Sequence, residues 1–489
     1  MVWKVSVVVA LAALLPPTLG TSTSASNFKQ VCSKIQRAIS PASTVFYPGS
    51  ANYAADNAHW ATSSDQASAC SVEPGTAADV STILQILGST RTPFGVKGGG
   101  HTTSLGFSST TGVQISMRRF SSVTYNKQNQ TATIGSGLIW DDVYAALEPH
   151  GVIVAGGRVS GVGVAGFTLG GGYNWLANQV GLTLDTVEVF ELVKPTGEIV
   201  YVTPSSDPDL FFGLRGTHNN FGIVTRFTLK AFKRDKVWGG VIAYSADQMP
   251  AVDAATARFA TNNTDPKAQI ISGPTFINGE LQIDVVLFYD GTTQPVGVFD
   301  DFLAIPSTSQ NLSTRTFLSL VQAGTPPTVL NRQYRAAFHV TTVLEYSPAM
   351  VAAVLNETTF WGNKLLDQGE FLVVTNIEIF LPSIYLHGVP SAFPPLRNAA
   401  YQPNLFYFSW NSSSSDAVFH AALKQSADHL TNVAIQLGQP VGDAALYPNY
   451  ALYDTPLERI YGNNLPRLRA IKARVDPENV MGLAGGFKL

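Results

Sequence analysis

The segment from Val96 to Gly106 reads Val-Lys-Gly-Gly-Gly-His-Thr-Thr-Ser-Leu-Gly and has the residue types for a specific chemistry. Three consecutive glycines leave one face of the backbone bare, so that successive N–H groups can turn inward and hold a phosphate. His101 follows directly and places a nucleophilic imidazole where a phosphate-bearing cofactor would lie. The segment predicts a large cofactor that is held by its phosphates and can be bonded covalently. The alternative is a glycine-rich surface loop with a solvated histidine.

A second glycine cluster runs from Gly156 to Gly172 and contains eight glycines. Within it, residues 161–166 match the pattern G-x-G-x-x-G, with acidic residues about 20 positions further on, as the nicotinamide-binding fingerprint requires. That fingerprint must open a helix, whereas the glycines at 170–172 would break one within its first turns. We therefore reject a Rossmann site and interpret the cluster as a backbone-lined surface. With a third cluster at residues 215–225, it suits a dinucleotide held along its length by backbone.

Composition limits the classes of protein to which the chain can belong. Its 489 residues are enough for two or three domains with buried cores, and 45% hydrophobic against 13% charged residues argues against disorder. Lys and Arg number 31 and Asp and Glu 34, which gives a formal net charge of −3. Because no basic block stands out, we expect no nucleic-acid partner.

The N-terminus has the layout of a signal peptide, which we assign to residues 1–25. Lys4 precedes the apolar run Val5 to Leu15, and small residues follow the two prolines at 16 and 17. The run is too short for a permanent membrane span. We therefore expect a secreted, extracellular protein with no membrane partner.

Cysteine usage agrees with an oxidising compartment. Cys32 and Cys70 are the two cysteines, and we expect them to pair, which would stabilise the chain by roughly 3–4 kcal/mol on the chain-entropy model. The alternative is two separate buried thiols. Five Asn-x-Ser/Thr sequons are predicted to be glycosylation acceptors: Asn129, Asn262, Asn311, Asn356 and Asn411.

Hydrophobic spacing predicts mixed helices and strands, an α+β fold. In the first half, helices are expected at 77–87, capped by Thr76, and at 140–147, with strands at 93–96, 112–116, 131–134 and 152–155. Past residue 237, strands are expected at 282–289 and 371–379, and helices at 348–355, 415–437 and 465–474. The second half therefore predicts a domain with an antiparallel sheet.

The order of several motifs resembles one family closely: residues 74–80, 97–101, 161–172, 220–224, 447–450 and 476–480. The series is similar to the vanillyl-alcohol-oxidase superfamily with its PCMH-type FAD-binding domain. More narrowly, it resembles the berberine-bridge-enzyme-like oxidases, which include fungal carbohydrate and secondary-metabolite oxidases. The resemblance implies a two-subdomain FAD-binding domain, built from residues 26–236 and a returning segment 441–489. Between them, residues 237–440 would form a substrate domain with an antiparallel β-sheet covered by helices.

The resemblance also implies which residues hold FAD. His101 would bond the flavin 8α-methyl group. The remaining predicted cofactor-binding residues are Lys97, Gly98, Gly99, Gly100, Thr102, Gly106, Gly161, Val162, Gly166, Gly171, Gly172, Gly222, Ile223, Val224 and Asn449. Many members carry a second link, from a cysteine to flavin C6, but this chain has Val159 at that position. We therefore expect a single covalent link, through His101.

Three residues are candidates for the chemistry beside the flavin. The resemblance places Tyr447 and Tyr450 there, and Tyr450 is the first choice for base or orienting group. To act as a base near neutrality, its pKa of about 10 would have to be lowered by donors or positive charge. Glu378 alternates with Ile377 and Ile379 and is the second candidate, as a partly desolvated carboxylate. The alternatives are domain-interface packing for the tyrosines and a solvated strand face for Glu378.

The sequence thus predicts a secreted FAD oxidase that takes a hydride from a C–OH or activated C–H bond of a small molecule or oligosaccharide and reduces O2 to H2O2. Val162 favours an oxidase, because the resemblance places it near the oxygen-reactive face of the flavin, where dehydrogenases tend to carry Leu or Ile. The alternatives are a flavin dehydrogenase with another acceptor and a non-catalytic flavin-containing binding protein. We expect a monomer.

The aromatic residues of the second domain and the histidines other than His101 are the remaining candidates for a role at the site. Aromatic residues of the second domain could stack on a substrate or form its core: Phe380, Tyr385, Phe406, Tyr407, Phe408 and Trp410. The histidines other than His101 show no metal-ligand spacing, so we expect no metal and interpret them as structural or surface residues: His59, His150, His218, His339, His387, His420 and His429.

Overall fold

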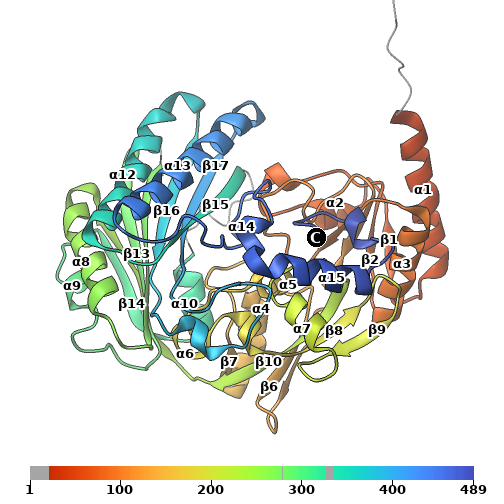
Figure 1. The fold of residues 1–489 in the computed structure, drawn as a ribbon, viewed down its shortest axis with the longest axis horizontal. Helices are drawn as coiled ribbons and strands as arrows, with labels where there is room; N and C mark the ends of the chain where they lie inside the picture. Colours follow the sequence, from red (N-terminus) through yellow and green to blue (C-terminus); the bar gives the residue numbers. More distant parts are fainter. Residues whose placement is uncertain (1–20, 278, 326–333) are drawn as a thin grey trace, which may run out of the picture.

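The computed structural model describes residues 21–277, 279–325 and 334–489. Three sheets organise the chain, and Figure 1 shows the largest of them on one side of the molecule and the other two on the opposite side. Helices and strands alternate irregularly, so the α+β prediction is confirmed. Most of the predicted signal peptide lies outside the described residues. Within them, no helix combines the length and apolarity needed to cross a membrane.

The first sheet has four strands in the order β1 (Thr44–Phe46), β2 (Cys70–Glu73), β4 (Val113–Ser116) and β3 (Phe94–Lys97). Helices α1 (Thr21–Ala38) and α3 (Ala77–Thr90) belong to the same hydrophobic core as this sheet. Thr76 caps α3 as predicted, since its side chain accepts a hydrogen bond from the Asp79 N–H. The Cys32–Cys70 disulfide joins α1 to β2, which confirms the predicted pairing.

The second sheet has six strands. Its strands are β5 (Val123–Asn126), β6 (Thr131–Gly135), β10 (Ile223–Lys233), β8 (Val187–Val193) and β9 (Ile199–Val202), with β7 (Val152–Val154) paired to β10. The helices of this part are α4 (Trp140–Leu147), α5 (Val164–Gly170), α6 (Ala177–Val180) and α7 (Pro208–Leu214). Helix α4 has the predicted bounds. Helix α5 ends at Gly170, because Gly171 adopts φ +137°, so the glycine triplet breaks the helix as expected.

The third sheet has seven strands, all antiparallel. In spatial order they are β14 (Ser309–Arg315), β11 (Val237–Ser245), β13 (Glu280–Tyr289), β12 (Ala268–Ile277), β16 (Phe371–Glu378), β17 (Gln402–Trp410) and β15 (Arg335–Val343). The helices of this part are α8 (Met249–Asn262), α9 (Asp300–Leu303), α10 (Phe317–Ala323), α12 (Pro348–Lys364) and α13 (Asp416–Gln436). Helices α8, α12 and α13 cover one face of the sheet (Figure 1). Helix α12 continues nine residues beyond the predicted end at residue 355.

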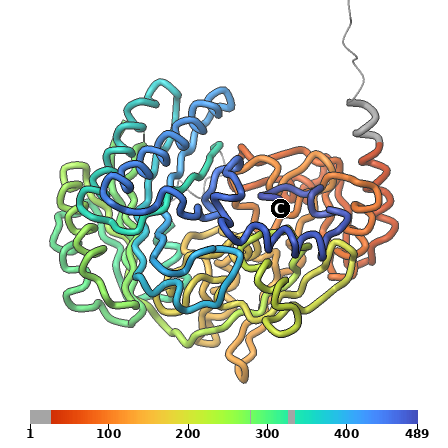
Figure 2. Tube along the Cα trace, in the orientation of Figure 1, coloured from red at the N-terminus to blue at the C-terminus, as the bar shows by residue number. Residues whose placement is uncertain are grey.

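The C-terminal segment returns to the part built from the N-terminal segment, as Figure 2 shows. It contains α14 (Glu458–Tyr461) and α15 (Leu465–Val475), and α15 ends before Asp476-Pro477 as predicted. Further along, Ala484 forms a parallel bridge with Phe94 of β3. Residues near both ends of the chain therefore form the walls of one site.

Candidate active site

A cavity of about 600 Å³ lies between the glycine clusters and the face of the seven-stranded sheet that the helices leave uncovered. Fourteen of the predicted site residues line it: Gly98, Gly99, Gly100, His101, Thr102, Val162, Gly166, Gly222, Ile223, Val224, Glu378, Tyr447, Asn449 and Tyr450. Val159, the residue at the expected cysteine position, also lines it. The structure thus brings together residues from five distant segments of the chain.

Five predicted cofactor residues lie outside the cavity wall, and each has another structural task. The Lys97 ammonium group donates to the carbonyl oxygens of Ala55 (2.7 Å), Asp56 (3.2 Å) and Ala58 (2.5 Å), at the C-terminal end of α2 (Ala51–Asn57). A cation is favourable there because the last carbonyls of a helix lack partners within the helix. The other four are glycines with positive φ: Gly106, Gly161, Gly171 and Gly172.

The two glycine clusters touch each other backbone to backbone. A Cβ atom on Gly99 would lie 2.5 Å from Gly163 Cα, and one on Gly163 would lie 2.5 Å from Gly99 N. Either substitution would force the two loops apart. The glycines thus do more than expose N–H groups, because they allow two loops to form one continuous wall.

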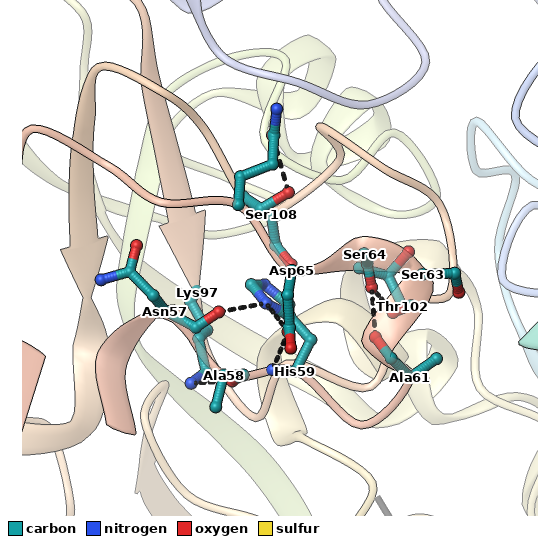
Figure 3. A network of polar contacts seen from close by, with 12 residues as sticks. Asn57, Ala58, His59, Ala61, Ser63, Ser64, Asp65, Lys97, Thr102 and Ser108 are labelled. Carbon is teal, nitrogen blue, oxygen red and sulfur yellow. Dashed lines mark hydrogen bonds and ion pairs between the residues drawn. The ribbon is translucent and has the colours of Figure 1, made fainter. Parts of the chain in front are cut away.

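The loop of residues 58–65, part of which Figure 3 shows beside Thr102, contacts the residues on both sides of His101. Trp60 N–H donates to the carbonyl oxygen of Gly100 at 2.9 Å, and the Ser64 hydroxyl donates to that of Thr102 at 2.6 Å. The carbonyl groups of both neighbours of His101, Gly100 and Thr102, are therefore held. The imidazole stacks on the Trp60 ring, with 4.3 Å between ring centroids and an interplanar angle of 12°.

The same loop is braced from both sides. On one side, the His59 ring is buried, and its Nδ1 lies 2.9 Å from the Asn57 carbonyl oxygen. The backbone N–H of His59 donates to Asp65 Oδ1 at 2.7 Å (Figure 3). On the other side, Thr62 N–H donates to the Tyr334 carbonyl oxygen, and the Ser63 hydroxyl donates to that of Ala336 in β15. The loop therefore ties the peptides around His101 to an edge strand of the seven-stranded sheet.

Three polar side chains meet at the opposite wall of the cavity. Arg158, in the loop after β7, forms a buried ion pair with Glu378 at the end of β16. The Tyr450 hydroxyl donates to Glu378 Oε1 at 3.0 Å and lies 3.3 Å from Arg158 Nη2. The Glu378 side chain is 1% exposed, which excludes the alternative of a solvated strand face. We call this group the Arg158–Glu378–Tyr450 cluster.

Burial and the charges within this cluster shift the pKa values of Tyr450 and Arg158. Burial and the neighbouring Glu378 carboxylate raise the pKa of Tyr450 well above its ordinary value. Burial alone would lower the pKa of Arg158, but the Glu378 carboxylate and Tyr450 raise it, so the guanidinium is a permanent cation. The lowering that would make Tyr450 a base is therefore not found. In this cluster Tyr450 is a hydrogen-bond donor, and Glu378 is its acceptor.

Tyr447 and Asn449 form a second polar group behind Tyr450. The Tyr447 hydroxyl accepts hydrogen bonds from Gly172 N–H (3.0 Å) and Asn449 Nδ2 (2.8 Å), and burial raises its pKa to about 12. Asn449 Oδ1 lies 2.9 Å from His218 Nε2. Burial lowers the pKa of His218, so the ring is neutral, and because an amide oxygen only accepts, Nε2 carries the proton.

The sequence interpretation missed two groups of the site, Arg158 and His218. Arg158 is the one charged residue between Gly156 and Gly172. A charged residue within a glycine-rich, apolar segment indicates a buried, paired group, so the sequence contained a signal for Arg158. His218 was assigned to the structural or surface histidines, yet it lines the cavity. Its position follows from a left-handed backbone at φ +55°, which no sequence spacing indicates.

The aromatic residues of the second domain separate by strand alternation. Phe406, Phe408 and Trp410 point into the core beneath the helices, whereas Tyr407 lines the cavity with Phe338. Tyr385 is buried against Tyr173. The predicted cluster is thus mostly core, with one member at the site.

The cavity fits FAD. Three segments present backbone to it, and a Cβ on Gly98 would lie 3.0 Å from the Ser136 carbonyl oxygen, so the close approach of these segments requires glycine. The imidazole of His101 stands at the same wall. Among the residues that the structure describes, no group of three or more His, Cys, Asp or Glu side chains could hold a metal ion.

Comparison with known proteins gives two family matches and full-length relatives. A model described as FAD binding domain matches residues 68–203, and one described as Berberine and berberine like matches residues 446–484. The FAD-dependent monooxygenase drtC of Aspergillus calidoustus is 30% identical over 469 residues, which cover 91% of this chain and 87% of that protein. An FAD-linked oxidoreductase of Arthroderma benhamiae is 31% identical over 498 residues, covering 96% and 97%.

Solved structures agree on the fold. BBE-like 1 of Physcomitrella patens superposes with a TM-score of 0.73 at 21% identity, covering 93% of this chain and 97% of that one. A xylooligosaccharide oxidase from Myceliophthora thermophila, solved with xylobiose, gives 0.74 at 17% identity, covering 94% and 99%. At these identities the likeness concerns the fold, and it confirms the predicted PCMH-type architecture.

The buried ion pair predicts a stability effect. Replacing Arg158 by Leu should lower the free energy of unfolding by about 3–5 kcal/mol, because Glu378 is then left buried without its cation. The double variant Arg158→Leu/Glu378→Leu should recover much of that loss. Urea denaturation followed by tryptophan fluorescence measures both.

The control is Arg469→Leu, which removes an exposed ion pair with Glu458. This change should affect stability far less than Arg158→Leu. Equal losses in the two single variants would contradict the importance of the buried pair.

Proposed function

Because the chain belongs to the berberine-bridge-enzyme-like family of FAD-linked oxidoreductases, we propose that it is an oxidase acting on a C–OH or activated C–H bond of a small molecule or oligosaccharide. One observation carries the proposal: a single cavity joins the backbone of the glycine clusters to the Arg158–Glu378–Tyr450 cluster. When bound, FAD supplies a two-electron acceptor that takes a hydride from the substrate carbon and returns both electrons to O2 as H2O2.

The cluster supplies the proton chemistry. Glu378 accepts the proton of the substrate hydroxyl, since it is the cavity-wall carboxylate whose two oxygens Tyr450 and Arg158 already orient. The Tyr450 hydroxyl donates to Glu378 and holds it in one rotamer. Arg158 fixes the cluster electrostatically, with its guanidinium 5.7 Å from the centroid of the Trp175 ring and 5.6 Å from that of Phe380. These apolar rings also keep water from the far side of the ion pair.

We further propose a single covalent attachment of FAD through His101. The loop of residues 58–65 supports this role, because it holds the carbonyl groups of Gly100 and Thr102 and stacks Trp60 on the imidazole, which leaves few alternative positions for the ring. Val159 stands in the cavity wall where a second link would need a thiol. Val162 also lines the cavity, and its small side chain supports reaction with O2.

The attachment is tested by denaturing the protein. In acid-precipitated, SDS-denatured wild type, yellow flavin should stay with the chain and raise its mass by one FAD, whereas His101→Ala should release it. The matched control is His150→Ala, which removes an exposed histidine away from the cavity and should retain the flavin. A colourless wild-type chain would contradict the covalent link, and a chain without any FAD would contradict the proposed function.

The assignment of the base predicts an order of effects. Glu378→Gln should lower kcat by about 10²–10⁴, because it removes the proton acceptor but keeps the shape of the side chain. Tyr450→Phe should lower kcat less, since it removes one orienting hydrogen bond. Anaerobic bleaching of the flavin by the best donor found in a peroxide-release screen measures both rates at equal flavin content. If Tyr450→Phe has the larger effect, the tyrosine is the base.

Secretion is the remaining part of the proposal. The disulfide and the N-terminal apolar run support it, and all five sequon asparagines are exposed. Expressed in a eukaryotic host, the protein should appear in the medium with an N-terminus near residue 26. Treatment with peptide-N-glycosidase should lower its mass. An intracellular chain that begins at Met1 would contradict the signal peptide.

A further inference from the structure

The register of the seven-stranded sheet maps its cavity-facing surface residue by residue. Asp284 of β13 pairs with Gly273 of β12, and the next cavity-facing position of β12, Ile271, pairs with Glu378 of β16. Asn376 lies two residues before Glu378 on the same strand and also lines the cavity. Adjacent strands are about 4.8 Å apart and alternate residues about 6.7 Å apart, so Asp284 and Glu378 are separated by about 12 Å at Cα. The two side chains can therefore contact opposite ends of one substrate.

Asp284 is the unusual residue of this surface. In the described part of the chain, its carboxylate has neither a salt bridge nor a hydrogen bond, although it is half buried in the cavity wall. Burial also raises its pKa. A carboxylate in such a place is costly unless a ligand provides a donor. The structure therefore contains an acceptor for which the chain itself has no partner in the described residues.

Gly273 keeps the space between Asp284 and the catalytic strand open. A Cβ on Gly273 would lie 2.6 Å from Asn376 Oδ1, so the absence of a side chain lets the Asn376 amide extend over β12 towards β13. Asp284 and Asn376 thus form a polar lane across three strands. Both residues can pair with a hydroxyl group, which donates to one and accepts from the other.

The surface between the lane and Glu378 is apolar, whereas Thr275 and Gln282 line the cavity on the other side of the lane. Next to Glu378 and along the neighbouring strands, the cavity-facing side chains are aliphatic: Val241, Ile271, Val286, Val374 and Leu405. At one end Tyr407 and Phe338 lie with 5.2 Å between ring centroids, and Trp60 stacks on Phe338 at 5.5 Å. On the aliphatic part of the surface, a sugar ring would bury hydroxyl groups against carbon without partners, which is unfavourable. A flat aromatic ring would pack against the same surface.

Building on the proposed function, we propose that the substrate is a planar aromatic compound with a hydroxyl group remote from the oxidised carbon, and that Asp284 accepts the hydrogen bond of that hydroxyl. Glu378 and Tyr450 contact the reacting end of the substrate, and the Asp284–Asn376 lane contacts its distal hydroxyl group. The aliphatic surface between them contacts the ring faces. Asp284 is thus a specificity-determining residue rather than a catalytic one.

Binding of compounds that lack the reacting hydroxyl tests this proposal without turnover. The probes are 6-methyl-2-naphthol and 2-methylnaphthalene, which differ in the remote hydroxyl, and xylobiose as the oligosaccharide. Titration calorimetry of the FAD-loaded wild type should give a Kd for the naphthol about tenfold or more below that for 2-methylnaphthalene, with xylobiose weakest. Asp284→Leu should bring the two naphthalene values to within about twofold, because the acceptor is gone.

Two variants keep the test interpretable. Asp253→Leu removes a half-buried carboxylate on α8, outside the cavity, and should leave the Kd ratio at the wild-type value. Asp284→Asn keeps the shape and a neutral acceptor, so it should give an intermediate ratio even if the leucine variant folds poorly.

Three results would overturn the proposal: an unchanged ratio in Asp284→Leu, tighter binding of xylobiose than of the naphthol, or no binding of either naphthalene. Because these are binding measurements, they can fail while the His101 and Glu378 results stand. The reverse also holds.

Discussion

The ion pair between Arg158 and Glu378 is the constraint on which the rest of the site depends. It joins the loop after β7, on the cofactor side, to the end of β16, on the substrate side, and it is almost completely buried. Desolvation of two charges is unfavourable, so such a pair persists where geometry and further hydrogen bonds compensate. Tyr450 provides one such bond from a third part of the chain. A single buried contact thus sets the relative position of the two halves and the orientation of the proton acceptor.

The cofactor side is built by close backbone contact rather than by charge. Gly99 and Gly163 touch without intervening side chains, and the loop of residues 58–65 holds the carbonyl groups of both neighbours of His101. The hydrogen bonds from Thr62 and Ser63 extend the same bracing to β15 of the substrate-side sheet. The same loop therefore contacts both the neighbours of His101 and the sheet that forms the substrate wall.

Much of this arrangement could be predicted from the sequence where the signal is local. The cap at Thr76, the bounds of α4 and the break at the glycine triplet follow from propensity and backbone geometry. The ordered glycine and tail motifs identified the fold, and most of the residues predicted from them line one cavity. Lys97 could not be assigned in this way, because its task depends on where α2 ends in space. The roles of Arg158 and Tyr450 depend likewise on burial and on partners hundreds of residues away, which spacing does not encode.

The return of the C-terminal segment has a consequence for biosynthesis. Both glycine clusters and the whole seven-stranded sheet leave the ribosome before residues 447–450 and 485–486, which complete the cavity wall. A chain that stops before Tyr447 would have the cofactor loops and the substrate wall but no closed site between them. The cavity wall is therefore complete only after this C-terminal segment has been translated and has left the ribosome.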